Sequence, residues 1–326
     1  MNRTALEQSV YRDFGYADSP ASAVSARVQG YLNDRHRRIL TRPGTERLRM
    51  ETGTFSTVAS QAAYSLDMPI ERILKLSDTT NDNPLYERGL DWYRQVEPDS
   101  TNTGGTPMYY IPLRYSPALR SIGGTGLWIV STSASDTTQT AHVETIDTNG
   151  SMTSATATFN GTTRVQVGTA TNHQRLLRFS SSAVGVGVLE LYDASSSGNK
   201  VSSIFLSRTN AQFWVIALWP LASAVNTIQV DYVHHIRDFV VAYDEPQLPL
   251  DFHYLVAIGA KIDECRKKGE RGDSRIQQWQ AEWEEGIKRL QYFIESGPDT
   301  IIVPGRIGMD IDRLSNLGPA FPSGRW

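Results

Sequence analysis

The sequence lacks the features that mark several large protein classes. Its 326 residues include one cysteine, which excludes a disulfide framework. No apolar run is long enough to span a bilayer, and the first residues, MNRTALEQSVYRDFG, lack the apolar centre of a signal peptide. The formal charge of −3 argues against a general nucleic-acid binder. We therefore expect a chain that stays in a cytoplasm, or in something assembled there.

Catalytic and metal-binding motifs are also missing. The sequence has no glycine-rich dinucleotide or phosphate loop, no paired-cysteine pattern, no H-E-x-x-H and no G-x-S-x-G. His234 and His235 are adjacent, and neighbours on a strand point to opposite faces, so a shared metal is not expected. Cys265 fits a small core residue, with a reactive thiol as the alternative. We expect no enzyme activity, no cofactor and no metal site.

Two amphipathic helices are predicted near the C-terminal end. Apolar residues recur at steps of three and four, first at Phe252, Leu255, Ile258, Ile262 and Cys265, then at Ile276, Trp279, Trp283, Ile287, Leu290 and Ile294. Pro246 and Pro249 precede the first helix, and the glycine-containing turn KKGERGD separates the two. This pattern predicts an antiparallel αα-hairpin.

Opposite charges gather on two of the predicted helices. A long helix from Pro20 to about Leu40 ends in a basic cluster. Its members are Arg35, Arg37, Arg38 and Arg42, with His36 among them. They suit either a solvated helix end or contact with an acidic partner or phosphates. The last helix carries Glu282, Glu284 and Glu285, which suit either a solvated face or an intersubunit salt-bridge surface.

The middle of the chain predicts β structure. Short apolar runs with period two occupy 54–58, 64–66, 70–76, 108–113, 213–218 and 228–236. Between them, 117–210 is rich in Ser and Thr, with hairpin-turn signals at Asn149-Gly150 and Asn160-Gly161. Many short strands at about ten-residue spacing predict an inserted β-sandwich.

These patterns predict an α+β protein with three parts. Residues 1–116 with 211–296 form a discontinuous helical domain, made of N-terminal helices and the αα-hairpin, with a small β-sheet. Residues 117–210 form the inserted sandwich, and 297–326 an extended tail. The tail is too apolar for a free segment and either packs on its own domain or docks into a neighbour. Its apolar residues are Ile301, Ile302, Val303, Ile307, Ile311, Leu314, Phe321 and Trp326.

The order of several segments resembles a known family. The helix ends in YLNDRHRRIL, and FSTVASQAAYSL, IERILKLSD, WYR, GGTPMYYIPL, VDYVHHIRDF and DEPQLPLDFHYLVAIGA follow. This order is similar to that of the head-to-tail adaptor (connector) proteins of tailed bacteriophages, the short-tailed ones in particular. The resemblance covers roughly the first 115 residues and 210–295. The inserted domain departs from the minimal family pattern and resembles the immunoglobulin-like decorations of phage structural proteins.

The resemblance implies a structural virion protein at the head–tail junction. Such adaptors form a ring under the portal protein, usually of twelve copies, carry the tail or nozzle, and let genomic DNA pass without sequence-specific binding. The apolar tail would then dock into the portal. A heterologous ring needs two complementary patches per chain, and the basic cluster of one subunit facing the acidic residues of the next is our hypothesis for them.

A second function remains open. The chain could be a tail or surface protein whose β-sandwich recognises a carbohydrate or receptor, with aromatics such as Trp128 and Phe159 in contact with the ligand. Aromatic residues in a sandwich belong more often to its core. The αα-hairpin separates the two hypotheses, because an adaptor is built on it and a receptor binder has little use for it.

Overall fold

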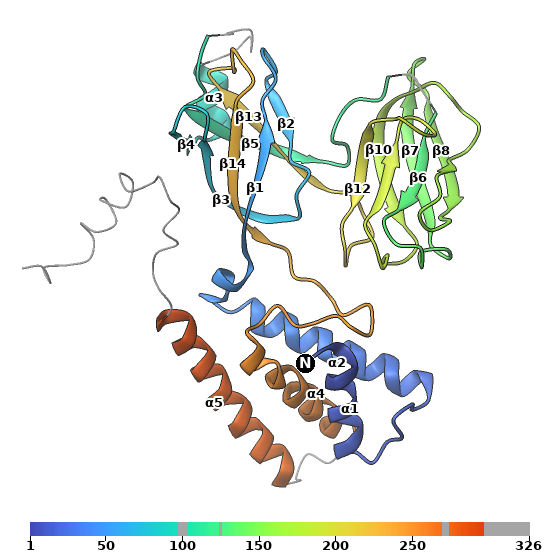
Figure 1. Cartoon of the computed structure of the whole chain (residues 1–326), viewed down its shortest axis with the longest axis vertical. Helices are drawn as coiled ribbons and strands as arrows, with labels where there is room; N and C mark the ends of the chain where they lie inside the picture. Colours follow the sequence, from blue (N-terminus) through green and yellow to red (C-terminus); the bar gives the residue numbers. More distant parts are fainter. Residues whose placement is uncertain (97–103, 124–125, 269–273, 297–326) are drawn as a thin grey trace, which may run out of the picture.

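The computed structural model describes residues 1–96, 104–123, 126–268 and 274–296. Helices gather at one end of the molecule, and two β structures stand side by side at the other (Figure 1). The helix-rich part draws on both ends of the sequence, so the chain leaves it, builds the β structures and returns.

The helical layer contains α1 (Arg3–Asp13), α2 (Ser22–Leu40), α4 (Tyr254–Lys267) and α5 (Ser274–Ser296). The helix α4 lies in the middle and packs against the other three. One face of each helix is apolar, and these faces meet in a shared core. Its buried members include Leu6, Val10, Val28, Leu32, Ile39, Leu255, Val256, Ala260, Ile287 and Leu290. Apolar spacing therefore fixes which face of each helix is buried.

A seven-stranded sheet forms the first β structure. Its strands are β1 (Met50–Ser56), β2 (Ala63–Ser65), β3 (Ile70–Asp78), β4 (Asn83–Glu87), β5 (Tyr109–Ser116), β13 (Phe213–Trp219) and β14 (Thr227–His234). They lie in the order β1-β14-β3-β4-β5-β13-β2, antiparallel except for β4 with β5. The ring centres of Phe55 in β1 and Tyr64 in β2 lie 5.4 Å apart, so the two outer strands of the sheet are close together. The sheet is therefore curled around its own apolar core.

Two shorter helical segments flank this sheet. The helix α3 (Leu90–Val96) packs beside β5, and the 3-10 turn η1 (Thr45–Arg49) joins α2 to β1. A second 3-10 turn, η2 (Leu250–Phe252), leads into α4. The turn η1 contacts α2, α5 and β14, so it ties the helical layer to the sheet.

The second β structure is a two-sheet sandwich. One sheet has the order β10-β7-β8, from β7 (Thr140–Asp147), β8 (Met152–Thr158) and β10 (His173–Ser181). The other has the order β12-β11-β6-β9, from β6 (Trp128–Ser131), β9 (Val165–Gln166), β11 (Leu189–Tyr192) and β12 (Lys200–Ile204). Phe159, Phe179, Leu191 and Val201 are buried between the sheets.

The predicted fold class is wrong in its proportions. The chain is α+β overall, but most of it is β, and the sheet expected to be small has seven strands. A helical adaptor domain carrying a minor sheet is not what the structure contains. The reason is long-range pairing: β1 pairs with β14 across 171 to 183 residues of sequence, which local periodicity cannot reveal. Among the described residues, no helix is long and apolar enough to cross a membrane.

Candidate assembly interface

An ion pair fixes α2 against α4. Arg35 donates from Nε to Asp263 at 2.6 Å, and its Nη2 bonds the second carboxylate oxygen. Both side chains are largely buried. Gly259 makes room for this arginine, because a Cβ built there would lie 2.6 Å from Arg35 Cδ. Removing one partner of such a pair leaves a buried charge without compensation, so the contact specifies how the two helices pack.

A second buried pair lies one residue further along α4. Glu264 is fully buried and accepts hydrogen bonds from Arg27 at 2.8 and 2.9 Å and from Tyr16 Oη at 2.6 Å. Burial alone would raise the pKa of Glu264, but the hydrogen bonds from Arg27 and Tyr16 lower it below its ordinary value. The carboxylate therefore stays charged and holds α2 and the segment after α1 on α4.

The Trp283 ring on α5 contacts the arginines at the basic end of α2. The guanidinium of Arg42 lies 4.9 Å from the centre of the Trp283 ring, and that of Arg35 lies 5.4 Å from it. Such cation–π contacts are worth on the order of 1 kcal/mol each. On the α4 side, a Cβ at Gly286 would lie 2.3 Å from Leu255 Cδ2, so this glycine allows the close approach of α5 to α4.

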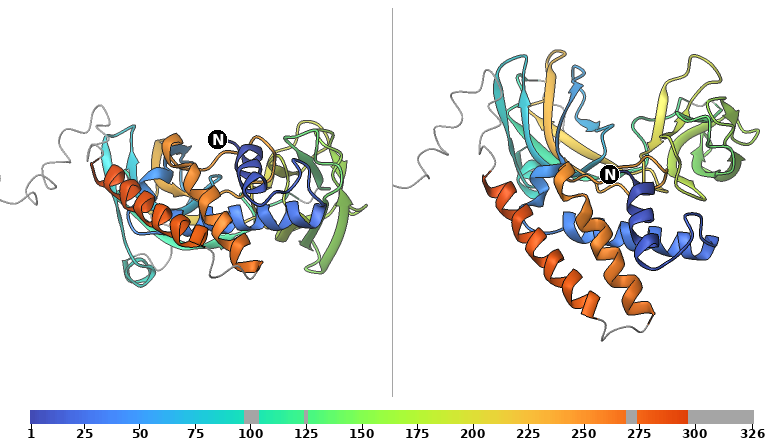
Figure 2. Two further views of the ribbon diagram at one scale, coloured as in Figure 1. Left: turned by 90° about the horizontal axis from the view of Figure 1, so that it is seen from below. Right: turned by 60° about the horizontal axis from the view of Figure 1, so that its bottom comes forward.

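The acidic residues of α5 face away from the rest of the chain. Glu282, Glu284 and Glu285 are exposed, and Glu285 pairs with Arg289 one turn later. The helix lies at the outer side of the helical layer (Figure 2). In its last turn Tyr292 is 73% exposed and Phe293 48%. The outward face of α5 therefore carries these three glutamates beside the exposed Lys288 and Arg289, and it ends in two aromatic side chains.

The predicted basic cluster is divided between internal and external roles. Arg35 is buried with Asp263, and Arg37 pairs with Asp238 through Nε at 2.9 Å. Arg42 covers Trp283, and Arg38 is exposed. Within one chain, the structure brings Arg42 to α5 but leaves the three glutamates pointing outward. Arg38, Glu282 and Glu284 are thus the exposed members that form no ion pair among the described residues.

The predicted tail contacts concern residues outside the described part of the chain. These are Ile301, Ile302, Val303, Ile307, Ile311, Leu314, Phe321 and Trp326.

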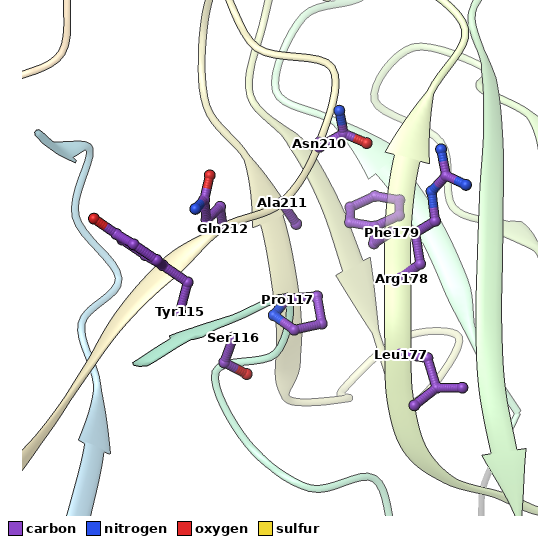
Figure 3. A pocket seen from close by; sticks show the side chains of 9 residues that line it. All are labelled: Tyr115, Ser116, Pro117, Leu177, Arg178, Phe179, Asn210, Ala211 and Gln212. Atoms are coloured by element: carbon purple, nitrogen blue, oxygen red, sulfur yellow. The ribbon is translucent and has the colours of Figure 1, made fainter. Parts of the chain in front are cut away.

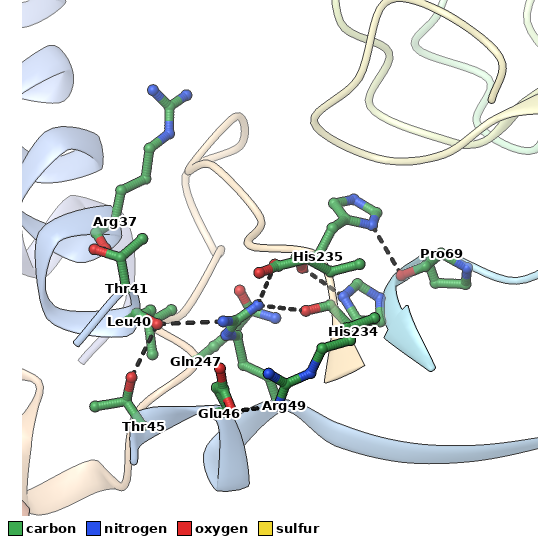
Figure 4. A network of polar contacts seen from close by, with 12 residues as sticks. Arg37, Leu40, Thr41, Thr45, Glu46, Arg49, Pro69, His234, His235 and Gln247 are labelled. Carbon is green, nitrogen blue, oxygen red and sulfur yellow. Dashed lines mark hydrogen bonds and ion pairs between the residues drawn. The ribbon is translucent and has the colours of Figure 1, made fainter. Parts of the chain in front are cut away.

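A network of polar contacts joins α2, η1 and the sheet, and no pattern in the sequence predicted it (Figure 4). The buried Arg49 donates to the carbonyl oxygens of Leu40 at 3.2 Å and His234 at 2.6 Å, and to Glu71 at 2.5 Å. It thereby links the end of α2, the end of β14 and the strand β3. Only its position directly before a strand could have pointed to it.

The histidines at this junction correct one expectation. The rings of His234 and His235 stack 4.6 Å apart, because β14 ends at His234 and the next residue leaves the strand geometry. His235 bonds the carbonyl of Leu206 at 2.8 Å, and His234 bonds Arg237 at 2.8 Å. Burial lowers the pKa of His234 to about 4. The described residues contain no cluster of three metal-ligating side chains.

Polar contacts of Asp67 help to hold the sandwich against the curled sheet. Asp67, in the turn between β2 and β3, accepts a hydrogen bond from Ser203 at 3.1 Å and pairs with Lys200. A pocket of about 200 Å³ lies where the chain passes between the two structures, and Tyr115, Arg178 and Asn210 are among its walls (Figure 3). Its lining comes from both structures, so it marks their joint.

The two aromatic residues proposed for contact with a sugar differ in exposure. Phe159 is 2% exposed and belongs to the core of the sandwich. Trp128 is partly buried, and a Cβ at Gly126 would lie 2.9 Å from its ring.

Comparison with known proteins gives no family. No protein-family model matches the sequence, and no curated protein matches it. A crystal structure of the TRIM65 PSpry domain aligns with 52% of this chain and 90% of that one, at 10% identity and a TM-score of 0.10. A score this low carries no argument about fold or function.

Proposed function

We propose that this chain is a structural virion protein that joins the head of a tailed phage to its tail. In this role it assembles as a ring under the portal, carries the tail or nozzle below, and surrounds the channel through which DNA leaves. The order of segments that resembles the adaptor family motivates the proposal. The single structural observation in its support is the outward exposure of Glu282, Glu284 and Glu285 on α5.

A closed ring requires two different complementary surfaces on each chain. The helical layer offers three exposed glutamates on α5, Glu282, Glu284 and Glu285, and an exposed arginine, Arg38, on α2. Because Arg35 and Arg37 have partners within the chain, the intersubunit pairing that we propose is narrower than the full basic cluster. It joins Arg38 of one subunit to Glu282 and Glu284 of the next, because Glu285 already pairs with Arg289.

The first experiment is mass photometry of the purified chain, alone and mixed with the portal ring of the same virus. We expect a complex whose added mass corresponds to a ring of chains. Absence of binding at every concentration tested would contradict the adaptor function. Deletion of 300–326 then tests the tail as the portal-docking segment, and full binding by the truncated chain would refute that role.

Charge reversal tests the pairing itself. Glu284→Lys and Arg38→Glu should each reduce ring formation, and the double variant should restore it. Arg114→Glu, at an exposed position on β5, is the matched control and should leave ring formation unchanged. If folded double variants assemble no better than the single ones, the pairing is wrong.

A further inference from the structure

The strand β8 is an open sheet edge. It is the outer strand of β10-β7-β8, on the side of the sandwich that points away from the curled sheet (Figure 1). Its pairing with β7 runs without interruption from Thr140↔Thr158 to Ile146↔Met152. The opposite side of β8 therefore presents a straight row of backbone groups.

The hydrogen bonds at both ends of the pair identify the free groups. Phe159 N donates to Gln139 O, and Asp147 N donates to Ser151 O. Hydrogen-bonded pairs alternate along an antiparallel ladder, so odd-numbered residues of β8 bond to β7 and even-numbered ones face outward. The outward groups belong to Met152, Ser154, Thr156 and Thr158, and none has a backbone partner among the described residues.

The other three edges of the sandwich are protected. The register of β10 with β7 has two irregularities, and the carbonyl oxygen of Phe179 in β10 accepts a hydrogen bond from Ala211 N. At the β12 edge, the carbonyl oxygen of Val201 accepts a hydrogen bond from Leu119 N. The β9 edge is short, since this strand has only two residues. By contrast, β8 has seven residues, MTSATAT, with no charge, no proline and no bulge. Proteins normally block such edges, because an open one pairs with another strand.

We propose that β8 pairs antiparallel with β8 of a second copy of this chain, about a twofold axis at Ala155. In this register Ser154 of one copy lies opposite Thr156 of the other, and Met152 lies opposite Thr158. The outward N–H and C=O groups of one strand then face those of the other strand, which gives roughly eight main-chain hydrogen bonds. The result is one continuous six-stranded sheet.

The side chains of β8 suit this self-pairing. Ser154 and Thr156 are exposed on the outer face, where cross-strand hydroxyl pairs are favourable. Ala155 and Ala157 lie on the inner face and are too small to obstruct a second copy. With no like charges opposite each other, nothing on the strand opposes the twofold register.

The pair is expected to be weak and to involve free chains. Two short strands bury less than the roughly 1,200 Å² of a stable interface, so association requires high protein concentration. A twofold contact cannot lie between neighbours of one cyclic ring, because those contacts are heterologous. The inference therefore does not depend on the proposed adaptor function, and a dimer differs from a ring in mass.

Disulfide trapping tests the register directly. In the proposed pair, residue 155 lies opposite itself at about 4.5 Å between Cα atoms, a distance that a disulfide can span. Residue 153 lies about 13 Å from its own counterpart, which is too far. The native Cys265 is fully buried, so the introduced thiol is the accessible one. We expect Ala155→Cys, and not Thr153→Cys, to give a disulfide-linked dimer of the full chain under mild oxidation.

Substitutions at Thr156 distinguish pairing along the β8 edge from cross-links that form when two chains collide at random. Thr156→Pro removes an outward N–H without removing a bond to β7, and should abolish the cross-link of Ala155→Cys. Thr156→Lys, which is compatible with the strand, should reduce it. Gln174→Lys, at an exposed position on β10 at the opposite edge of the same sheet, should not. Equal cross-linking at 153 and 155, no cross-linking at 155 in the folded chain, or indifference to both Thr156 variants would overturn the proposal.

Discussion

Arg35 crosses α4 at Gly259, where the absence of a side chain leaves room for the arginine stem. A Cβ at this position would lie 2.6 Å from Arg35 Cδ and 3.2 Å from Arg35 Cβ. The second distance matters more, because Cβ cannot move away without a shift of the helix itself. The buried pair with Asp263 therefore depends on a glycine of the opposite helix.

Gly259→Ala should destabilise the chain by about 1–3 kcal/mol, because the new methyl group forces α2 and α4 apart. Urea unfolding monitored by tryptophan fluorescence measures this effect. Gly30→Ala is the matched control: Gly30 also lies within a helix, but a Cβ there meets nothing within 4 Å. That control should gain about 0.5–1 kcal/mol. Equal effects at the two positions would contradict the packing argument.

Glu264→Gln should cost roughly 3 kcal/mol at neutral pH, since it leaves Arg27 without its buried counter-charge. The pKa of Glu264 is lowered in the folded chain, so its contribution is present above the ordinary pKa of about 4.5 and is lost as pH falls through the folded value. The stability difference between the two proteins should therefore shrink on acidification. A difference that stays constant down to pH 3 would argue against a charged Glu264.

His36 should make the chain sensitive to mild acid. Burial lowers its pKa to about 3, while the unfolded chain protonates near 6.5. The unfolded state thus binds more protons between these values, and stability falls as pH decreases below 6.5, by up to about 1.4 kcal/mol per pH unit. Urea unfolding of the wild type and His36→Gln between pH 7 and 4.5 measures the two slopes. His234 contributes in the same direction, so the variant slope should be smaller but not zero. Identical slopes would disprove the assignment to His36.

Arg49→Met should loosen the helical layer from the curled sheet. The substitution removes the Arg49 donor from the carbonyl oxygen of His234, at a cost of roughly 1–3 kcal/mol for a buried group left unpaired. The carbonyl oxygen of Leu40 loses Arg49 as well but keeps Thr45 Oγ1 at 2.9 Å. Limited proteolysis should then cleave within 41–49 faster than in the wild type.

Arg72→Met provides the comparison for Arg49. Arg72 also pairs with a glutamate, Glu46, but its side chain is 55% exposed. An exposed pair contributes about 0–1 kcal/mol, so proteolysis should be nearly unchanged. If both variants behave alike, Arg49 has no special place at the junction.

Local periodicity predicted the helices better than the sheet. The apolar stripe that begins at Phe252 and the one that ends at Ile294 coincide with α4 and α5 within a few residues, because each helix buries one face. Within the sheet, the dipeptide Asn83-Pro84 is a turn signal, yet it forms the first two residues of the strand β4. Its place in the sheet comes from pairing with β3 and β5, which no local pattern contains.

Among the charged residues, local periodicity likewise predicts some positions and not others. Exposure of Glu282, Glu284 and Glu285 follows from their place opposite the apolar stripe of α5. The burial of Arg35 does not, because Arg35 falls in a run of basic residues typical of a solvated helix end. Its partner Asp263 and the space at Gly259 lie more than 220 residues away, and only the packed helices bring them together.

The two chain crossings into the sandwich start from one place on the curled sheet. Ser116 at the end of β5 and Phe213 at the start of β13 are register partners, so both connections leave from one end of a single antiparallel pair. A pull on the sandwich would therefore load β5 and β13 together and in the same direction, and the hydrogen bonds of the sheet would share the force. The sandwich is thus held by a double tether, to which the contacts of Asp67 with Ser203 and Lys200 add.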